Sequence, residues 1–257
     1  MTDSIDLNSD LGEGYGAWSM GADDDMLAIV SSANIACGYH AGDPDIMATT
    51  LALCAKYGVT AGAHPSYPDR DGFGRRAMPD LKGDSLTNHI VYQLGALSAL
   101  ASTIPISISH VRTHGALANA SEFNLDLAHA VADAIRATEQ TWMIMAGSPA
   151  AKLAQELGIP HITQAFADRA YHSDYRLQSR QQTGAVLHDS EEIVERAWRM
   201  FQEQSVVSVE GDSIPMLFDS LCVHGDTPGA VRTAEQLRQR FEQGGVCIEA
   251  AVARIPT

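Results

Sequence analysis

Seven ionisable residues follow short apolar stretches of the chain, at positions where β-strands are expected to end. They are Asp10, Glu13, His40, His64, His114, Asp168 and His224. Imidazole and carboxylate groups together form the ligand set of zinc and other divalent ions that activate water. The same groups perform general acid–base catalysis without a metal. The spacing leaves both alternatives open, because no His-Glu-x-x-His motif fixes two ligands on one helix face.

Within this set we predict the catalytic residues Asp10, Glu13, His40, His64, His114 and Asp168. If a divalent metal ion is bound, the predicted ligands are Asp10, His40 and His64. Each histidine alone is equally compatible with a hydrogen-bonded framework role. Four histidines at the same position relative to a strand are harder to explain in that way, so the set as a whole indicates a functional centre.

Residues 59–76 combine several of these features. The stretch starts as an apolar strand, ends at His64, and continues into a loop rich in proline and glycine that carries Arg70, Arg75 and Arg76. Binding and catalytic groups are commonly held on such loops by a rigid scaffold. The three arginines are therefore a candidate pocket for a small anion.

The elements that must position these groups alternate along the chain. Main strands are predicted at residues 4–10, 32–37, 59–64, 108–112, 142–146, 162–166 and 220–223, and minor strands at 206–209 and 246–248. Helices are predicted at residues 23–30, 44–57, 84–102, 121–137, 149–157, 190–204 and 228–243. Asp43 is the predicted N-cap of the second helix, with Pro44 at its first position and Gly58 as its stop. Residues 172–189 are predicted to be irregular.

This alternation, without a linker, predicts one α/β domain over residues 1–257, with parallel strands and right-handed helical crossovers. An open doubly wound sheet would gather its site at one switch point and draw on few strands. Here the polar groups follow nearly every main strand, which suits a barrel whose loops surround one mouth. We therefore predict a TIM-like (β/α) barrel, with seven strands rather than eight.

Several ionisable residues receive a structural interpretation. The remaining histidines are expected to be structural or solvent-facing; they are His89, His110, His129, His161, His172 and His188. Asp168 and Arg169 are adjacent, so a simple salt bridge between them is an alternative to a catalytic role for Asp168. No nucleophile elbow and no Walker A motif occurs in the sequence, which argues against a serine hydrolase and a P-loop.

Composition excludes several classes of protein. The chain carries 17 Lys and Arg against 32 Asp and Glu, a net charge of −15, which argues against nucleic acid or an anionic membrane as the partner. The four cysteines form no Cys-x-x-Cys pair and are expected to be reduced thiols. The first residues contain no apolar signal region and no apolar run reaches membrane-spanning length, so we predict a cytoplasmic protein.

The motifs around the predicted site resemble those of one known family. They are DLNSDLGEGYG (6–16), NIACGYHAGDP (34–44), GAHPSYPD (62–69) with GFGRR (72–76), FADRAY (166–171) and VHGD (223–226). Together they are similar, in order and over nearly the whole chain, to the LamB/YcsF family of ATP-hydrolysing 5-oxoprolinase A subunits. The resemblance implies a (β/α) barrel similar to that of polysaccharide deacetylases.

The resemblance also implies an activity. This is the ATP-dependent opening of 5-oxo-L-proline (pyroglutamate) to L-glutamate, carried out with the partner subunits B and C. A five-membered lactam is stable in water, so its carbonyl must be activated, for example by phosphoryl transfer from ATP, before water attacks. We expect the substrate to be bound by Asn8, Arg70, Arg75, Arg76, Arg112 and His224. The cofactors implied are ATP, with the partner subunits, and a divalent metal ion as an open alternative.

The sequence departs from the family pattern after the fourth strand. The family usually has Lys-Pro-His-Gly-Ala-Leu-Tyr-Asn where residues 112–119 read RTHGALAN. Arg112 keeps a cation but not a titratable amine, and Ala118 replaces a tyrosine. A stand-alone metal-dependent amidohydrolase or deacetylase acting on another lactam or amide is therefore the second hypothesis, and a non-catalytic binding module is the third.

Overall fold

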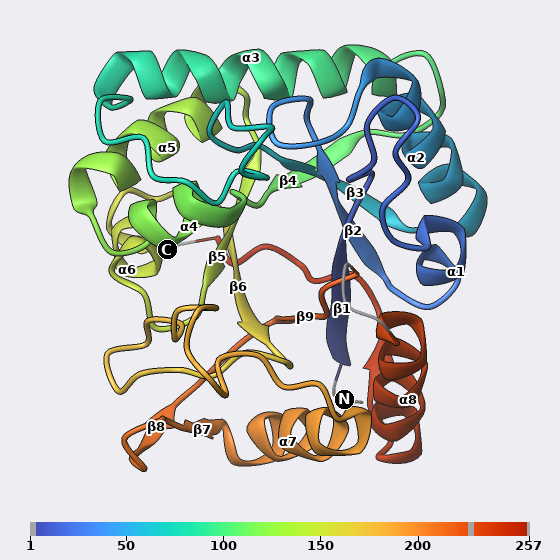
Figure 1. The fold of residues 1–257 in the computed structure, drawn as a ribbon, viewed down its shortest axis with the longest axis vertical. Helices are drawn as coiled ribbons and strands as arrows, with labels where there is room; N and C mark the ends of the chain where they lie inside the picture. Colours follow the sequence, from blue (N-terminus) through green and yellow to red (C-terminus); the bar gives the residue numbers. More distant parts are fainter. Residues whose placement is uncertain (1–3, 226–228, 256–257) are drawn as a thin grey trace.

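The computed structural model describes residues 4–225 and 229–255 and shows strands enclosed by helices (Figure 1). The strands are β1 (Ser4–Leu11), β2 (Ser32–Ala36), β3 (Thr60–His64), β4 (Ile108–Val111), β5 (Thr141–Met145), β6 (His161–Phe166), β7 (Ser205–Val207), β8 (Ser213–Pro215), β9 (Ser220–Cys222) and β10 (Cys247–Ile248). The helices are α1 (Asp23–Leu27), α2 (Pro44–Tyr57), α3 (Gly83–Ala101), α4 (Gly115–Ser121), α5 (Leu125–Ala137), α6 (Pro149–Glu156), α7 (Ser190–Glu203) and α8 (Ala230–Gln243).

The main strands form a closed parallel barrel. They pair in the order β1-β2-β3-β4-β5-β6-β9, and β9 pairs again with β1, so the described part of the chain contains a closed ring of seven strands. The short β10 adds to the outer end of β1 through Ser4 and Ile5. The prediction of a seven-stranded (β/α) barrel is confirmed. Closure aligns the carboxyl ends of all seven strands at one mouth, which is where barrel enzymes carry their active sites.

Local sequence explains where α2 begins and ends. The Asp43 side chain accepts hydrogen bonds from the backbone N–H groups of Asp45 and Ile46, both at 2.9 Å, and Pro44 takes the first helical position. Gly58 ends the helix with φ 69°, a left-handed conformation that suits glycine. Both predictions for this helix are confirmed.

Two other predicted helix starts were wrong. The helix α3 begins at Gly83 after an extended Lys82, so Asp84 lies in its first turn, where the helix dipole favours an acid, rather than at the cap. The helix predicted to start at Ser121 starts at Leu125 instead, capped by Asn124, because Ser121 is the last residue of an additional short helix, α4. The predicted start of α8 at Pro228 lies outside the described residues.

The interior of the barrel is polar. Asp6, Asn8 and Asp10 alternate along β1 and are buried or nearly so. The Asn8 amide donates to Ser220 Oγ (2.6 Å), and its carbonyl oxygen accepts from Asn34 Nδ2 (2.9 Å). Asn34 Nδ2 also donates to Asp10 Oδ1 (2.9 Å). Buried polar groups are costly unless they are paired, so this network fixes both the strand register and the direction of Asp10.

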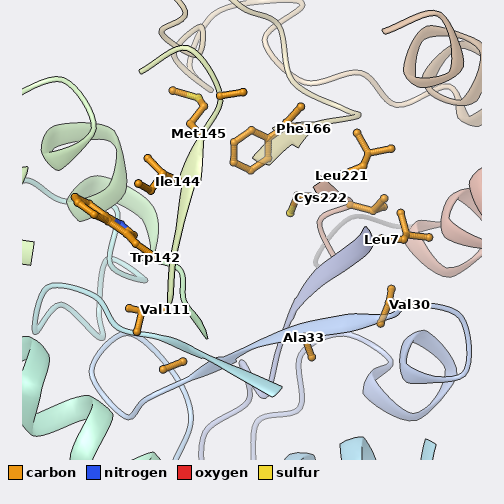
Figure 2. Close-up of a cluster of buried hydrophobic side chains, with 14 of the residues drawn as sticks. Leu7, Val30, Ala33, Val111, Trp142, Ile144, Met145, Phe166, Leu221 and Cys222 are labelled. Atoms are coloured by element: carbon orange, nitrogen blue, oxygen red, sulfur yellow. The ribbon is translucent and has the colours of Figure 1, made fainter. Parts of the chain in front are cut away.

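The hydrophobic core lies between the strands and the surrounding helices. Figure 2 shows part of it, with Leu7, Ala33, Val111 and Leu221 from four strands and the fully buried Trp142 from β5. Alternation along each strand sends these side chains outward while the polar ones point inward. The apolar layer outside the barrel thus stabilises the scaffold, and the barrel interior remains available for ionisable groups.

One glycine of β3 makes room for a ring inside the barrel. A Cβ atom at Gly62 would lie 2.1 Å from Nε2 of His110, whose ring hydrogen-bonds Asn34 Oδ1 at 2.9 Å. We expect Gly62→Ala to lower the free energy of unfolding by at least about 2 kcal/mol, because the ring has to move and its hydrogen bond breaks. The control Gly95→Ala, at an exposed position of α3 with open space around it, is expected to gain up to about 1 kcal/mol. Urea unfolding of both variants is the measurement, and equal midpoints would contradict this packing.

A long segment after β6 extends over the mouth. Residues 172–189 contain no helix or strand, as predicted, and are tied down by hydrogen bonds. His172 Nδ1 donates to Glu210 Oε1 (2.6 Å), in the turn that joins β7 to β8, and Ser173 Oγ donates to Asp212 Oδ2 (2.8 Å). The bond from His172 lowers the pKa of Glu210 to about 2. The segment is therefore held in a defined place beside the barrel mouth.

Among the described residues, no helix has both the length and the apolar character that a membrane span requires.

Candidate active site

The predicted residues converge at the mouth of the barrel. Asp10, Glu13, His64, His114 and His224 line one cavity of about 480 Å³. Asp10 lies in β1 and His64 in β3, while Glu13, His114 and His224 follow β1, β4 and β9. These strands are far apart in the sequence, and their carboxyl ends meet at the same mouth. His40 does not line the cavity itself; its ring stacks on the His114 ring, with 3.8 Å between the ring centroids.

Two histidines face each other in an unusual way. His64 Nδ1 lies 2.6 Å from the carbonyl oxygen of Arg112, and His114 Nε2 lies 2.9 Å from that of Phe73. Because a carbonyl oxygen only accepts hydrogen bonds, each of these nitrogens carries its ring's proton. The remaining nitrogens, His64 Nε2 and His114 Nδ1, lie 2.9 Å apart. In neutral rings both carry a lone pair, so a cation or an additional proton is needed between them.

The loop after β3 holds the His114 ring in this orientation. Phe73 has φ 53°, a conformation that is uncommon for a bulky residue and that is found at functional sites. Gly74 follows with φ 65°, and a Cβ atom there would lie 2.7 Å from the His114 ring. Only glycine allows the loop to approach so closely, which places the Phe73 carbonyl against the ring nitrogen.

A carboxylate and a third imidazole complete the group. Glu13 Oε1 lies 3.1 Å from His40 Nε2 and 3.5 Å from His114 Nδ1. One ligand atom from each of Glu13, His40, His64 and His114 lies within 4.8 Å of the others, and all four residues are buried. His40 Nδ1 is buried without a hydrogen-bond partner among the described residues.

The chemistry of this donor set fits a divalent cation. Burial and the neighbouring histidines lower the pKa of His114 to about 3 and the pKa of His40 well below its ordinary value, so both rings are neutral, the form that binds a metal. Metal-binding histidines usually donate their second N–H to a carbonyl or carboxylate, as His64 and His114 do. The group differs from the predicted ligands Asp10, His40 and His64. Asp10 lies outside it: its Oδ1 accepts a hydrogen bond from Asn34, and its Oδ2 lies 3.4 Å from His64 Nε2.

Asp10 stands beside this group as an ionised carboxylate. Its Oδ2 lies 3.4 Å from His64 Nε2. Burial raises the pKa of Asp10, but the neighbouring imidazoles of His64, His224 and His114 outweigh burial and hold the pKa well below its usual range. Asp10 therefore adds a negative charge between the His64–His114 pair and His224.

The side chains of Asp168 and His224 form a dyad on the other side of Asp10. His224 Nδ1 donates to both carboxylate oxygens of Asp168, at 2.8 and 2.9 Å, and its ring stacks on Phe166. Burial raises the pKa of Asp168, but the interactions with His224, Arg169 and Arg180 outweigh it, so the net pKa is lowered and the carboxylate is charged. This bond fixes the proton on Nδ1 and leaves Nε2 of His224 as a base. The alternative prediction of an Asp168–Arg169 salt bridge was wrong, because Arg169 bonds backbone carbonyls instead.

The residues predicted to bind substrate fall into two groups. Arg75, Arg112 and His224 line the cavity, and Arg112 also forms a buried ion pair with Glu122. The remaining three lie outside the lining, as follows: Asn8 is bonded inside the barrel, Arg70 donates to the Gly38 carbonyl and stacks on Tyr15, and Arg76 pairs with Asp69. Their own protein partners occupy these three side chains, so the geometry does not support direct substrate contact by them.

Other lining residues were not predicted. Arg169, Arg176 and Arg180 face the cavity from the segment after β6, and Thr113 contributes a buried hydroxyl that has no partner among the described residues. The closeness of three arginines in an acidic chain was an available signal for the first group. The sequence contained no such signal for Thr113, because only the closed barrel shows that the residue next to His114 reaches the cavity.

Comparisons with known proteins agree with this architecture. A 5-oxoprolinase A subunit from Rhodopseudomonas palustris (strain BisB18) is 47% identical over 247 residues, covering 95% of this chain and 97% of that protein. One 5-oxoprolinase A subunit of Bradyrhizobium diazoefficiens, numbered 2 in that organism, is 46% identical over 245 residues, covering 95% and 96%. The crystal structure of a lactam utilization protein from Thermus thermophilus superposes with a TM-score of 0.90 at 36% identity, covering 96% of this chain and 99% of that one.

A more distant similarity concerns the fold alone. A family 4 carbohydrate esterase from Streptomyces lividans has a TM-score of 0.52 at 12% identity, with 99% of this chain and 98% of that chain covered. The expected similarity to the deacetylase barrel is therefore present in the fold.

The fold and the site together define a (β/α)-barrel protein with a histidine–carboxylate centre at the carboxyl ends of its strands. The chain belongs to the LamB/YcsF family, whose pattern matches residues 5–255.

Proposed function

We propose that this protein is the A subunit of an ATP-dependent 5-oxoprolinase, a hydrolase that opens the cyclic amide of 5-oxo-L-proline to give L-glutamate with partner subunits B and C. The proposal is supported by the names of its relatives and by the site. The observation that carries it is the pair of inward-facing nitrogens of His64 and His114, 2.9 Å apart beside Glu13 and on the same cavity as the Asp168–His224 dyad.

We propose that Glu13, His40, His64 and His114 hold a divalent metal ion. Such an ion, when bound, polarises a carbonyl oxygen and lowers the pKa of a bound water. Other residues of the chain orient the histidine side chains that would hold the ion. The carbonyls of Arg112 and Phe73 fix the two ring tautomers, and Asp10 adds negative charge next to His64.

His224 is the proposed proton-transfer group. His224 lines the cavity and Asp168 holds its Nδ1–H, so we propose that the ring accepts a proton from the attacking water at Nε2 and returns it to the amide nitrogen that leaves. Asp168 acts through His224 and is a positioning residue: its negative charge stabilises the imidazolium that forms during transfer.

The ATP requirement is proposed from the family resemblance of the sequence motifs and from the chemistry of the substrate. A five-membered lactam resists hydrolysis. Transfer of the γ-phosphoryl group of ATP to its carbonyl oxygen, with release of ADP, would make the ring carbon susceptible to water, and the phosphoryl group would leave as inorganic phosphate when glutamate forms. The subunit designation of the relatives points to further chains, here proposed to be subunits B and C. We also propose a cytoplasmic location, because the four cysteines are free thiols, as is usual in a reducing compartment.

The test is glutamate release from 5-oxo-L-proline by this chain with and without subunits B and C and ATP. We expect glutamate only when all components are present. No release by the full complex would refute the proposed function. Release by this chain alone, without ATP, would instead support the stand-alone amidohydrolase.

A further inference from the structure

The outer wall of the cavity is cationic although the protein is acidic. Five of the cavity residues are arginines, namely Arg75, Arg112, Arg169, Arg176 and Arg180. The chain as a whole has a net charge of −15. The floor, by contrast, carries the carboxylates of Asp10 and Glu13. Arg169, Arg176 and Arg180 come from the segment after β6 and form this wall, whereas Arg75 and Arg112 lie beside the histidines of the centre described above.

Two of the five arginines lack an acidic partner. Arg112 pairs with Glu122, and Arg176 pairs with Asp174. Within the described residues, Arg169 and Arg180 form no ion pair with a carboxylate. Their like charges repel, and the Asp168 carboxylate offsets this repulsion only in part, so a bound anion would stabilise the wall further.

The Arg169 guanidinium is rigidly held. Only 5% of the residue is exposed. Its Nη2 donates to the Gln178 carbonyl (2.7 Å) and its Nε to the Ala185 carbonyl (3.2 Å), so it fixes both ends of the turn that carries Arg180. Burial, and next the charge of Arg180, lower the pKa of Arg169 to about 10, and the neighbouring carboxylate of Asp168 opposes this shift without cancelling it.

We propose that Arg169 and Arg180 bind the carboxylate of the lactam substrate and thereby select lactams that carry an α-carboxylate. This inference rests on the proposed function, since it concerns the same cavity. Backbone carbonyls occupy Nε and Nη2 of Arg169, but within the described residues its Nη1 and the guanidinium of Arg180 make no hydrogen bond, so these groups can donate to the two carboxylate oxygens. With the carboxylate on this wall, the ring amide faces His64, His114 and His224, and the acidic floor disfavours the reversed orientation.

The test compares two probes that differ by the carboxylate alone, 5-oxo-L-proline and 2-pyrrolidinone. Binding to the full-length chain is measured by calorimetry, and KM is measured in the complex with subunits B and C. We expect the wild-type protein to prefer 5-oxo-L-proline by about 10- to 100-fold, the size expected for charge-assisted hydrogen bonds to one carboxylate. Arg180→Gln should remove most of this preference, because it weakens the binding of 5-oxo-L-proline and not that of 2-pyrrolidinone, with kcat little changed.

The control is Arg199→Gln, which removes the same charge from an exposed position of α7 and should leave both affinities unchanged. Inorganic phosphate is the third probe. Equal affinity of the wild-type chain for both lactams, binding of neither, or equal weakening of both by Arg180→Gln would overturn the inference. So would tight phosphate binding that Arg180→Gln abolishes while the preference between lactams persists.

The two proposals fail in different ways. Selective binding of 5-oxo-L-proline without glutamate release by the complex would leave the carboxylate site standing and refute the function. Glutamate release without any preference between the two lactams would support the proposed function and refute the carboxylate site.

Discussion

Glu13→Gln is expected to lower glutamate release by the reconstituted complex by about 10²- to 10³-fold and to weaken binding of a divalent metal ion by at least about tenfold. The substitution keeps the shape of the side chain and removes the negative charge from the group that contains His40, His64 and His114. Polarisation by a bound metal contributes several kcal/mol to transition states of this kind, which corresponds to that loss of rate.

Metal binding by this variant is measured by titrating chelator-treated protein with Zn²⁺ and Mn²⁺ in a calorimeter. Glu235→Gln is the matched control, since it is the same substitution at an exposed position of α8 and should change neither quantity. Unchanged metal affinity in Glu13→Gln would contradict the ligand role of Glu13. Wild-type protein that binds neither ion would show that an additional proton, rather than a metal, lies between the two histidines.

Asp168→Asn is expected to lower kcat by about 10²- to 10⁴-fold, the range for a general acid–base group, while KM changes little. The amide lacks the negative charge that holds the proton on His224 Nδ1 and stabilises the imidazolium. His224→Gln should cause a loss of similar size. Asp133→Asn, at an exposed position of α5, is the control for loss of one acidic group.

The combination of the two changes separates a positioning role from an independent one. If Asp168 acts only through His224, the double variant Asp168→Asn/His224→Gln should be about as active as His224→Gln alone, because the partner on which Asp168 acts is already absent. Losses that multiply in the double variant would show that Asp168 has a separate function.

The sequence was most informative where local chemistry decides the structure. The cap at Asp43 and the stop at Gly58 depend on a few neighbouring residues, and both were predicted from them. The histidines at the strand ends were predictable because parallel strands in a barrel place their carboxyl ends together. The short helix α4 was missed, since its seven residues begin at a glycine and carry no recognisable cap.

The partners within the site could not be predicted in the same way. The contacts of His64 with His114 and of Asp168 with His224 both depend on the order of the strands. That order is a property of the closed barrel. Asn8 was expected to bind the substrate. It lies two residues before Asp10 in β1 and belongs to the hydrogen-bond network inside the barrel. Arg180 lies in a segment without hydrophobic periodicity, so the sequence could not predict that it faces the cavity. Its position depends on the hydrogen bonds of Arg169 to the carbonyls of Gln178 and Ala185.

The most direct test of the central claim is glutamate release by a complex in which only this chain is altered, carrying Glu13→Gln and His224→Gln together. If this barrel mouth opens the lactam, the folded variant should assemble with subunits B and C and release glutamate no faster than the background without this chain. Release at the wild-type rate would show that the lactam is opened elsewhere in the complex.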